Sequence, residues 1–146
     1  MLRREPERWK LLPRWIRVFS WFFLLALVAI PVLHVAGIFY KGPMSFMIFG
    51  FNHSGAPSDP PALAIQAVLG LLGVAAFGLL WGKPWGLNAG VAAGVLGLGA
   101  VAVSTVLAWS SGRFVLQFEP FFQVPFLIAL ARRRPAWDGQ LDRNAA

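Results

Sequence analysis

Residues 113–134, RFVLQFEPFFQVPFLIALARRR, decide how the rest of the chain is interpreted. This apolar segment holds Glu119, the one acidic residue embedded in a long apolar run, and it ends in three arginines at 132–134. Pro120 and Pro125 lie where they would distort a helix, because proline lacks a backbone donor and clashes with the preceding turn. An ionisable side chain at membrane depth is costly and is a functional-site hypothesis by default. Glu119 is therefore the first candidate residue.

The composition indicates a membrane protein. Of the 146 residues, 58% are hydrophobic and only 13% are charged, whereas about a quarter of the residues in a soluble domain are charged. A chain this short would not hide so much apolar surface in one water-soluble core. The net charge of +7 does not indicate nucleic-acid binding, because the basic residues lie at the edges of apolar runs. The chain has no cysteine, which excludes disulfides and thiolate metal sites.

Four apolar segments approach or exceed the length needed to cross a bilayer, because a hydrocarbon core of about 30 Å requires about 20 helical residues. The sequence therefore predicts an all-α polytopic membrane protein with four transmembrane helices in an antiparallel bundle. The expected helices cover residues 17–40, 62–81, 85–109 and 114–131 of a transmembrane domain at 15–131. Residues 1–14 form a basic juxtamembrane leader, 41–61 an extracytoplasmic loop and 132–146 a basic cytoplasmic tail.

The connecting segments carry finer expectations. Residues 44–51 are apolar but too short to span, so they are expected to lie in the interface or to tuck back between helices. Residues 52–61 are rich in turn formers and predict an exposed loop. The tail beyond Trp137 is polar and is expected to be flexible.

The basic residues predict the orientation of the chain. With both termini in the cytoplasm, every lysine and arginine except Lys41 and Arg113 lies on the cytoplasmic side, as the positive-inside rule requires. Trp15, Trp81 and Trp85 then mark the inner boundary. We expect a multi-pass protein of the cell inner membrane, in contact with the lipid bilayer.

Small residues recur at four-residue spacing on the second and third expected helices. Such faces let helix backbones approach closely in lipid, where association depends on packing. We predict that they pack these helices together; a homodimer interface built from the same faces is the alternative. The residues are Gly70, Gly78 and Gly82 on the second helix, and Gly86, Gly90 and Gly94 on the third or at its start.

Polar side chains occur at similar depth in the outer halves of all four expected helices, about 6–9 Å from the boundary at 1.5 Å per residue. One interpretation is hydrogen bonding between helices near the interface. The other is an outward-facing pocket for a ligand or a proton, centred on Glu119 and sharing its helix face with Gln123. The candidate residues are Glu119, His34, Gln123, Gln66, Thr105 and Arg113.

The spacing of the phenylalanines in the last span favours a structural role for them over a role in ligand binding. Phe114, Phe118, Phe122 and Phe126 recur every four residues, which is more typical of a packing or lipid-facing surface than of a ligand cage.

Known catalytic motifs do not occur. The sequence contains no nucleotide-binding, metalloprotease or nucleophile-elbow motif, so we predict no catalytic residue and no cofactor. His34, His53 and Glu119 would offer three metal ligands if they came together, but the sequence alone predicts no metal site.

Three stretches carry a resemblance to a known group of proteins. They are PRWIRVFSWFF at 13–23, LLWGKPWGLN at 79–88 and FEPFFQVPFLIALARRRPAW at 118–137. They resemble small uncharacterised four-helix bacterial inner-membrane proteins, in which an acidic residue of the last span precedes a proline and a basic-aromatic tail. The resemblance implies a bacterial inner membrane, no assigned activity and no catalytic residue. The small multidrug-transporter family also has four helices, but its essential acid lies in the first span, where this chain has none.

Two function hypotheses follow from these patterns. The first is a non-enzymatic accessory or interaction subunit, acting as a homo-oligomer or within a larger membrane complex. The second is a carrier of a small molecule or a proton that uses the polar pocket around Glu119. An enzyme acting on lipid would need residues supplied by a partner chain.

Overall fold

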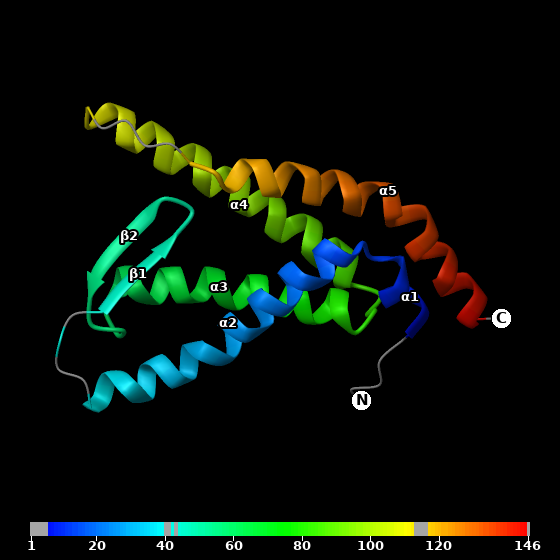
Figure 1. Cartoon of the computed structure of the whole chain (residues 1–146), viewed down its shortest axis with the longest axis horizontal. Helices are drawn as coiled ribbons and strands as arrows, with labels where there is room; N and C mark the ends of the chain where they lie inside the picture. The colour runs from blue at the N-terminus through cyan, green and yellow to red at the C-terminus, as the bar shows by residue number, and fades with distance from the viewer. Residues whose placement is uncertain (1–5, 40–41, 43, 113–116, 146) are drawn as a thin grey trace.

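The structure, a computed structural model, describes residues 6–39, 42, 44–112 and 117–145 and is mostly helical (Figure 1). The helices are α1 (Pro6–Leu11), α2 (Arg14–Phe39), α3 (Pro60–Leu80), α4 (Gly86–Ser110) and α5 (Glu119–Ala145). The strands are β1 (Met44–Ile48) and β2 (Phe51–Gly55). Among the described residues, three helical segments are long and apolar enough to cross a membrane, namely Arg14–Gly37, Pro60–Leu80 and Gly86–Ser110. They correspond to the first three expected spans.

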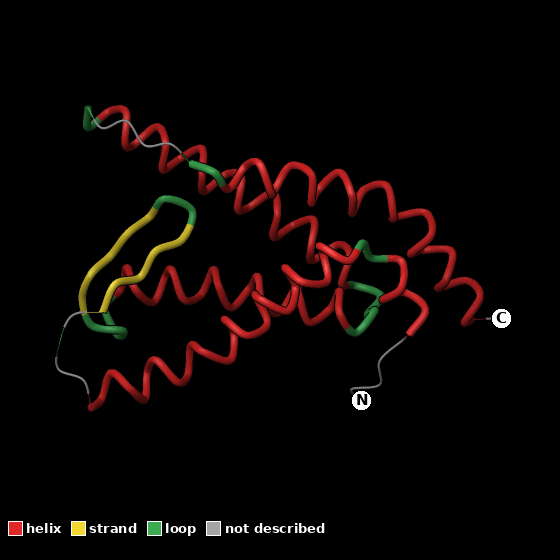
Figure 2. The backbone as a smooth tube through the Cα atoms, viewed as in Figure 1, coloured by secondary structure: helices red, strands yellow, loops and turns green. Residues whose placement is uncertain are grey.

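The long helices pack in sequence order. α3 lies between α2 and α4, and α4 lies between α3 and α5. The backbone trace shows α2, α3 and α4 running in alternating directions (Figure 2). Their apolar side chains extend around the whole helix, so Leu71 on α3 and Leu96 on α4 remain exposed while other faces are buried. This is the pattern of helices whose outer faces meet lipid.

The fourth expected span is not one continuous helix. Its residues 114–116 lie outside the described residues, and α5 begins only at Glu119. The start is explained locally by Pro120, because proline is well accommodated in the first helical turn, where its missing N–H needs no partner. α5 then continues to Ala145, so the chain beyond Trp137, which we expected to be flexible, extends the helix.

One apolar cluster packs the end of the molecule where α1 and the second half of α5 meet. Its fully buried members come from α2, α3, α4 and α5, and from the short segment between α1 and α2. They are Leu12, Ile16, Leu79, Leu87, Leu130 and Trp137. α1 itself packs against α5, and the buried Arg8 side chain donates a hydrogen bond from Nη1 to the Gly82 carbonyl at 3.1 Å. The beginning of the chain is thereby tied to the α3–α4 turn.

The α3–α4 turn is a glycine-dependent helix cap. Gly82 has φ of 65°. Its N–H donates to the Leu79 carbonyl at 3.2 Å, and the next N–H, of Lys83, donates to the Gly78 carbonyl at 2.8 Å. This pair of bonds is the Schellman motif, in which a residue in the left-handed region ends the helix. Gly82 therefore makes the turn, rather than joining the glycine face of α3 as we expected.

Gly78 and Gly86 bring α3 and α4 into direct backbone contact. A Cβ atom added to Gly86 would overlap the Gly78 carbonyl, and one added to Gly78 would approach the Gly86 Cα to 2.8 Å. Gly94 instead makes room for Leu127 of α5, and Gly90 makes room for both Leu130 of α5 and Leu79 of α3. These four glycines are therefore used for packing within the chain.

On α3, the closest approach to α2 is not at Gly70. An added Cβ at Gly70 would make only an ordinary contact, 3.9 Å from Leu27 Cδ1, whereas one at Gly73 would lie 3.1 Å from the Phe23 carbonyl oxygen. Four-residue spacing placed Gly70 on a packing face, but the crossing point of the helices lies almost one turn further along.

Residues 44–55 form a β-hairpin, so the all-α prediction is wrong for this segment. β1 and β2 pair antiparallel, with Met44 opposite Gly55 and Ile48 opposite Phe51. Phe49 and Gly50 connect them with φ of 50° and 76°, and two positive φ values are the signature of a type I′ turn. The expectation that 44–51 would lie in the interface or tuck back rested on length and hydropathy, and it missed the strand pairing that extends into the expected loop. Phe46 packs the hairpin onto Ala62 and Ile65 of α3.

Candidate functional site

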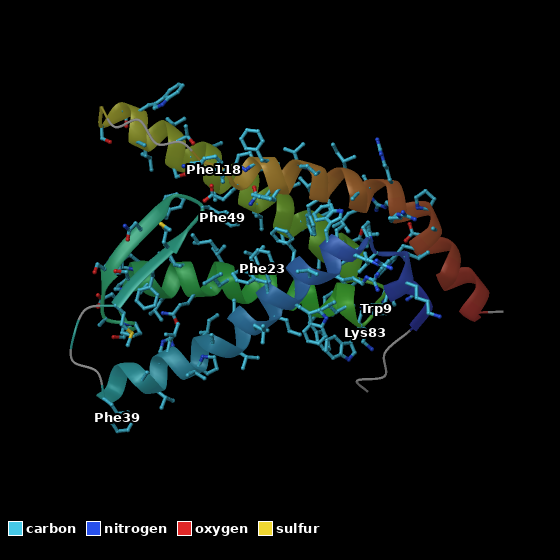
Figure 3. The ribbon with its side chains drawn as sticks, in the orientation of Figure 1. Trp9, Phe23, Phe39, Phe49, Lys83 and Phe118 are labelled. Atoms are coloured by element: carbon cyan, nitrogen blue, oxygen red, sulfur yellow. The ribbon has the colours of Figure 1, made fainter. Side chains whose placement is uncertain are left out.

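A cavity of about 150 Å³ lies between α2, α3, α4 and α5, beneath the tip of the hairpin. Figure 3 shows Phe49 at the hairpin tip near α4, and Phe23 on the middle of α2. Small residues of α3 and α4, among them Ala76 and Ala93, provide the room. Six of the sixteen lining residues are aromatic: Trp15, Phe19, Phe23, Phe49, Phe122 and Phe126.

Aromatic side chains join α2 to α5 along one side of the cavity. The rings of Trp15 and Phe126 lie 6.4 Å apart, and those of Phe19 and Phe122 lie 5.7 Å apart. The extensive helix-to-helix contacts run from α2 to α3, from α3 to α4 and from α4 to α5. The α2–α5 side is therefore closed by rotatable side chains, and Phe122 is 55% exposed on its outer surface.

The predicted phenylalanine stripe divides between two roles. Phe122 and Phe126 line the cavity, although we favoured a packing or lipid-facing surface for the whole stripe. Phe118 is 62% exposed, which fits that expectation. Phe114 lies outside the described residues.

Three residues with polar side chains belong to the lining of this largely apolar cavity: Ser20, Glu119 and Gln123. Glu119 stands in the first turn of α5, and Gln123 follows one turn later on the same face. The Gln123 Oε1 atom is buried and has no hydrogen-bond partner among the described residues. Ser20 is only 2% exposed. Glu119 takes no part in the His53–Asp59 contact or in the Arg134–Asp138 ion pair.

The hairpin tip closes the cavity through a short chain of hydrogen bonds. Gln117 donates from Nε2 to Ser104 Oγ at 2.7 Å, and Ser104 Oγ donates to the Phe49 carbonyl at 2.8 Å. Ser104 lies six residues before the end of α4 at Ser110, which is about 9 Å of helix. The tip therefore reaches into the bundle.

Phe49 adopts a conformation that its surroundings must maintain. A bulky residue with positive φ is uncommon, and such strain costs about 1–3 kcal/mol. Phe49 is buried, with only 7% of its surface exposed, and its ring lies against Gly97 of α4. Burial of the ring and the bond from Ser104 oppose the strain and keep this side chain in the cavity wall.

The other predicted polar residues do not join this cavity. Gln66 donates from Nε2 to the Pro57 carbonyl at 2.8 Å, and Thr105 donates to the Val101 carbonyl at 2.8 Å. His34 Nδ1 lies 3.2 Å from the Ile30 carbonyl in its own helix. Depth along a helix indicated a common layer, but depth does not determine the direction in which a side chain points. Arg113, the alternative partner of Glu119, lies outside the described residues.

The three possible metal ligands also remain apart. His53 Nε2 lies 3.2 Å from Asp59 Oδ2 at the base of the hairpin, and His34 faces its own helix backbone. No group of three or more histidine or acidic side chains that could hold a metal is found among the described residues.

Sequence reasoning found two of the cavity's polar residues and missed most of its wall. Glu119 and Gln123 were identifiable from their four-residue spacing, but the contributions of Ser20 and Phe49 depend on how α2 and the hairpin pack. Comparison of the chain with models of protein families, with curated proteins and with solved structures finds no match. The geometry of this cavity is therefore the basis for a functional assignment.

Proposed function

We propose that this chain is an integral membrane protein that binds a small, mostly apolar molecule with one polar end. The cavity carries this proposal, because it combines an aromatic wall with polar groups from Ser20, Glu119 and Gln123. Ligand sites are commonly apolar and contain a few polar groups that orient the ligand. A dry apolar cavity of about this volume accommodates a molecule the size of benzene in another protein. Binding and release of such a molecule would make the chain a carrier.

The route into the cavity in this proposal is sideways from the bilayer, between α2 and α5. Aromatic side chains rather than close backbone packing fill that side. Exposed side chains change rotamer in picoseconds to nanoseconds, whereas separating packed helices is slower. Apolar molecules also concentrate in the hydrocarbon region, where this opening would lie.

The matched pair Ala93→Leu and Ala92→Leu tests the cavity. Ala93 is buried in the wall, and its neighbour Ala92 is exposed and does not line the cavity. With ethylbenzene as the probe in a non-ionic detergent, we expect the wild type and Ala92→Leu to gain thermal stability, because a ligand that binds only the folded state stabilises it. Ala93→Leu should weaken binding about tenfold or more, since the added side chain takes the probe's space. Equal stabilisation of all three proteins would contradict the proposed site.

We further propose four membrane crossings with both termini in the cytoplasm. After α4 ends, Gln117 returns to contact Ser104, and α5 then runs along α4 to the buried Leu130. In this proposal, Gln117, Phe118 and the first part of α5 are the described part of the fourth crossing. The irregular backbone at Gln117 would be acceptable at membrane depth because it lies against protein. The distribution of basic residues supports the orientation.

The absence of native cysteine allows a clean test of this topology. Cysteine introduced at Ser110, at the outer end of α4, should react with a membrane-impermeant maleimide in intact cells. Cysteine introduced at Asp138 should react only after the membrane is permeabilised. Labelling of both positions from outside would instead indicate three crossings and would contradict the proposed fourth.

An accessory role in a larger membrane assembly is the second candidate function. Its support is the outward face of α2, where Val18, Phe22 and Leu25 are each more than 60% exposed and would be covered by lipid or by another membrane protein. A monomer in mild detergent that binds the probe would favour the cavity function over this one.

A further inference from the structure

We propose that the polar end of the ligand is positively charged, so that the cavity selects a small lipophilic cation such as a protonated arylalkylamine. This inference rests on the proposed binding function and specifies its ligand. It follows from three properties of the cavity wall that each favour a cation.

The first property is the sign of the ionisable group. Among the described residues that line the cavity, Glu119 is the only one with an ionisable side chain. No described basic residue forms an ion pair with it. A charged group in an apolar site is costly unless it is paired, and a cationic ligand would provide that pairing. An anionic ligand would instead be repelled by the carboxylate.

The second property is the aromatic wall. The faces of aromatic rings are electron-rich and attract a cation within about 6 Å of the ring centre, and quaternary ammonium groups are commonly recognised in this way. Phe19 of α2 and Phe122 of α5 are in contact with each other along one side of the cavity, and both belong to the same lining as Glu119. The carboxylate and the rings therefore attract the same kind of ligand.

The third property is the unused hydrogen-bonding capacity of Gln123. Its Oε1 atom is buried and lacks a partner among the described residues, and its Nε2 atom lies against Gly97. Buried polar atoms are normally hydrogen-bonded, so this acceptor would be satisfied by an N–H or O–H group of a ligand. Gln123 is one helical turn from Glu119, and a protonated amine could contact both.

Two probes of the same shape separate charge from size. Benzylammonium and ethylbenzene have the same heavy-atom framework, with a charged terminal nitrogen in one where the other has carbon. Their affinities are measured by the ligand-dependent rise in thermal stability of the full chain, in the same non-ionic detergent, for the wild type and for Glu119→Gln. Asp138→Asn is the control, because it also removes one negative charge from α5 but at an exposed position outside the cavity.

We expect Glu119→Gln to weaken binding of the cation at least about tenfold and to leave binding of ethylbenzene unchanged. Asp138→Asn should change neither affinity. If the neutral probe binds and Glu119→Gln leaves the affinity for the cation unchanged, the inference is overturned while the proposed binding function stands. If neither probe binds the wild type, the proposed function itself fails. Should Glu119→Gln not fold, the wild type must still bind the cation at least as tightly as the neutral probe, and weaker binding of the cation overturns the inference.

Discussion

Replacement of Trp137 by alanine should lower the free energy of unfolding by about 3–5 kcal/mol, the usual cost of truncating a fully buried large aromatic residue. Trp137 is 0% exposed and packs in the cluster where α5 meets the ends of α2, α3 and α4. Loss of the indole would leave a void that the surrounding leucines only partly fill. Urea or thermal unfolding of the purified protein in one detergent would measure the change.

Trp109→Ala is the matched control for this prediction, since it makes the same substitution at a side chain that is 64% exposed. Surface substitutions are usually within about 0.5 kcal/mol of the parent. A comparable loss of stability in both variants would show that Trp137 is not packed as described, and that the second half of α5 does not belong to the folded unit.

Replacement of Gly86 by alanine should also destabilise the protein, by about 1–3 kcal/mol, as is typical when atoms are forced into a packed interior. The added methyl group would overlap the backbone of α3 at Gly78 and Leu79. Backbone atoms cannot rotate away as a side chain end can, so α3 and α4 would have to separate at their closest point. Unfolding of the variant in the same detergent would measure the loss.

Gly99→Ala tests whether this effect comes from the contact rather than from the change of residue type. Gly99 lies on the same helix and has no atom within 4 Å of an added Cβ. Alanine is favoured over glycine within helices by up to about 1 kcal/mol, so this variant should be as stable as the parent or more stable. The two substitutions should therefore have opposite signs. Destabilisation by both would contradict the close α3–α4 contact.

The positions of α2, α3 and α4 were predictable because each depends on the local hydropathy of the chain. A run of about 20 apolar residues is long enough to span a bilayer, and turn-forming residues limit each run. The predicted segment 62–81 and the observed α3, Pro60–Leu80, differ by two residues at one end and one at the other. Gly82 also marks the end of α3 in the sequence, since glycine readily adopts the positive φ that the cap requires.

The hairpin was not predictable by the same reasoning. The residues of β1 are apolar enough to suit an interfacial segment. The pairing of Phe46 with His53 joins this stretch to residues that the sequence predicts to be an exposed loop. The Phe49–Gly50 turn differs from the usual Asn-Gly or Asp-Gly pair of type I′ turns. The structure maintains it through contacts with α4 that lie more than fifty residues away in the chain.

The sequence by itself determined where α2, α3 and α4 lie and that Glu119 and Gln123 share a helix face, because both follow from hydropathy and from 3.6 residues per turn. Only the tertiary structure decided which side chains surround them. Ser20, Phe49 and Ala93 come from three separate elements, and their meeting depends on how α2, α4 and the hairpin cross. Depth along each helix did not predict that meeting, because side-chain direction depends on how each helix is rotated. That rotation is set by close contacts such as Gly78 with Gly86.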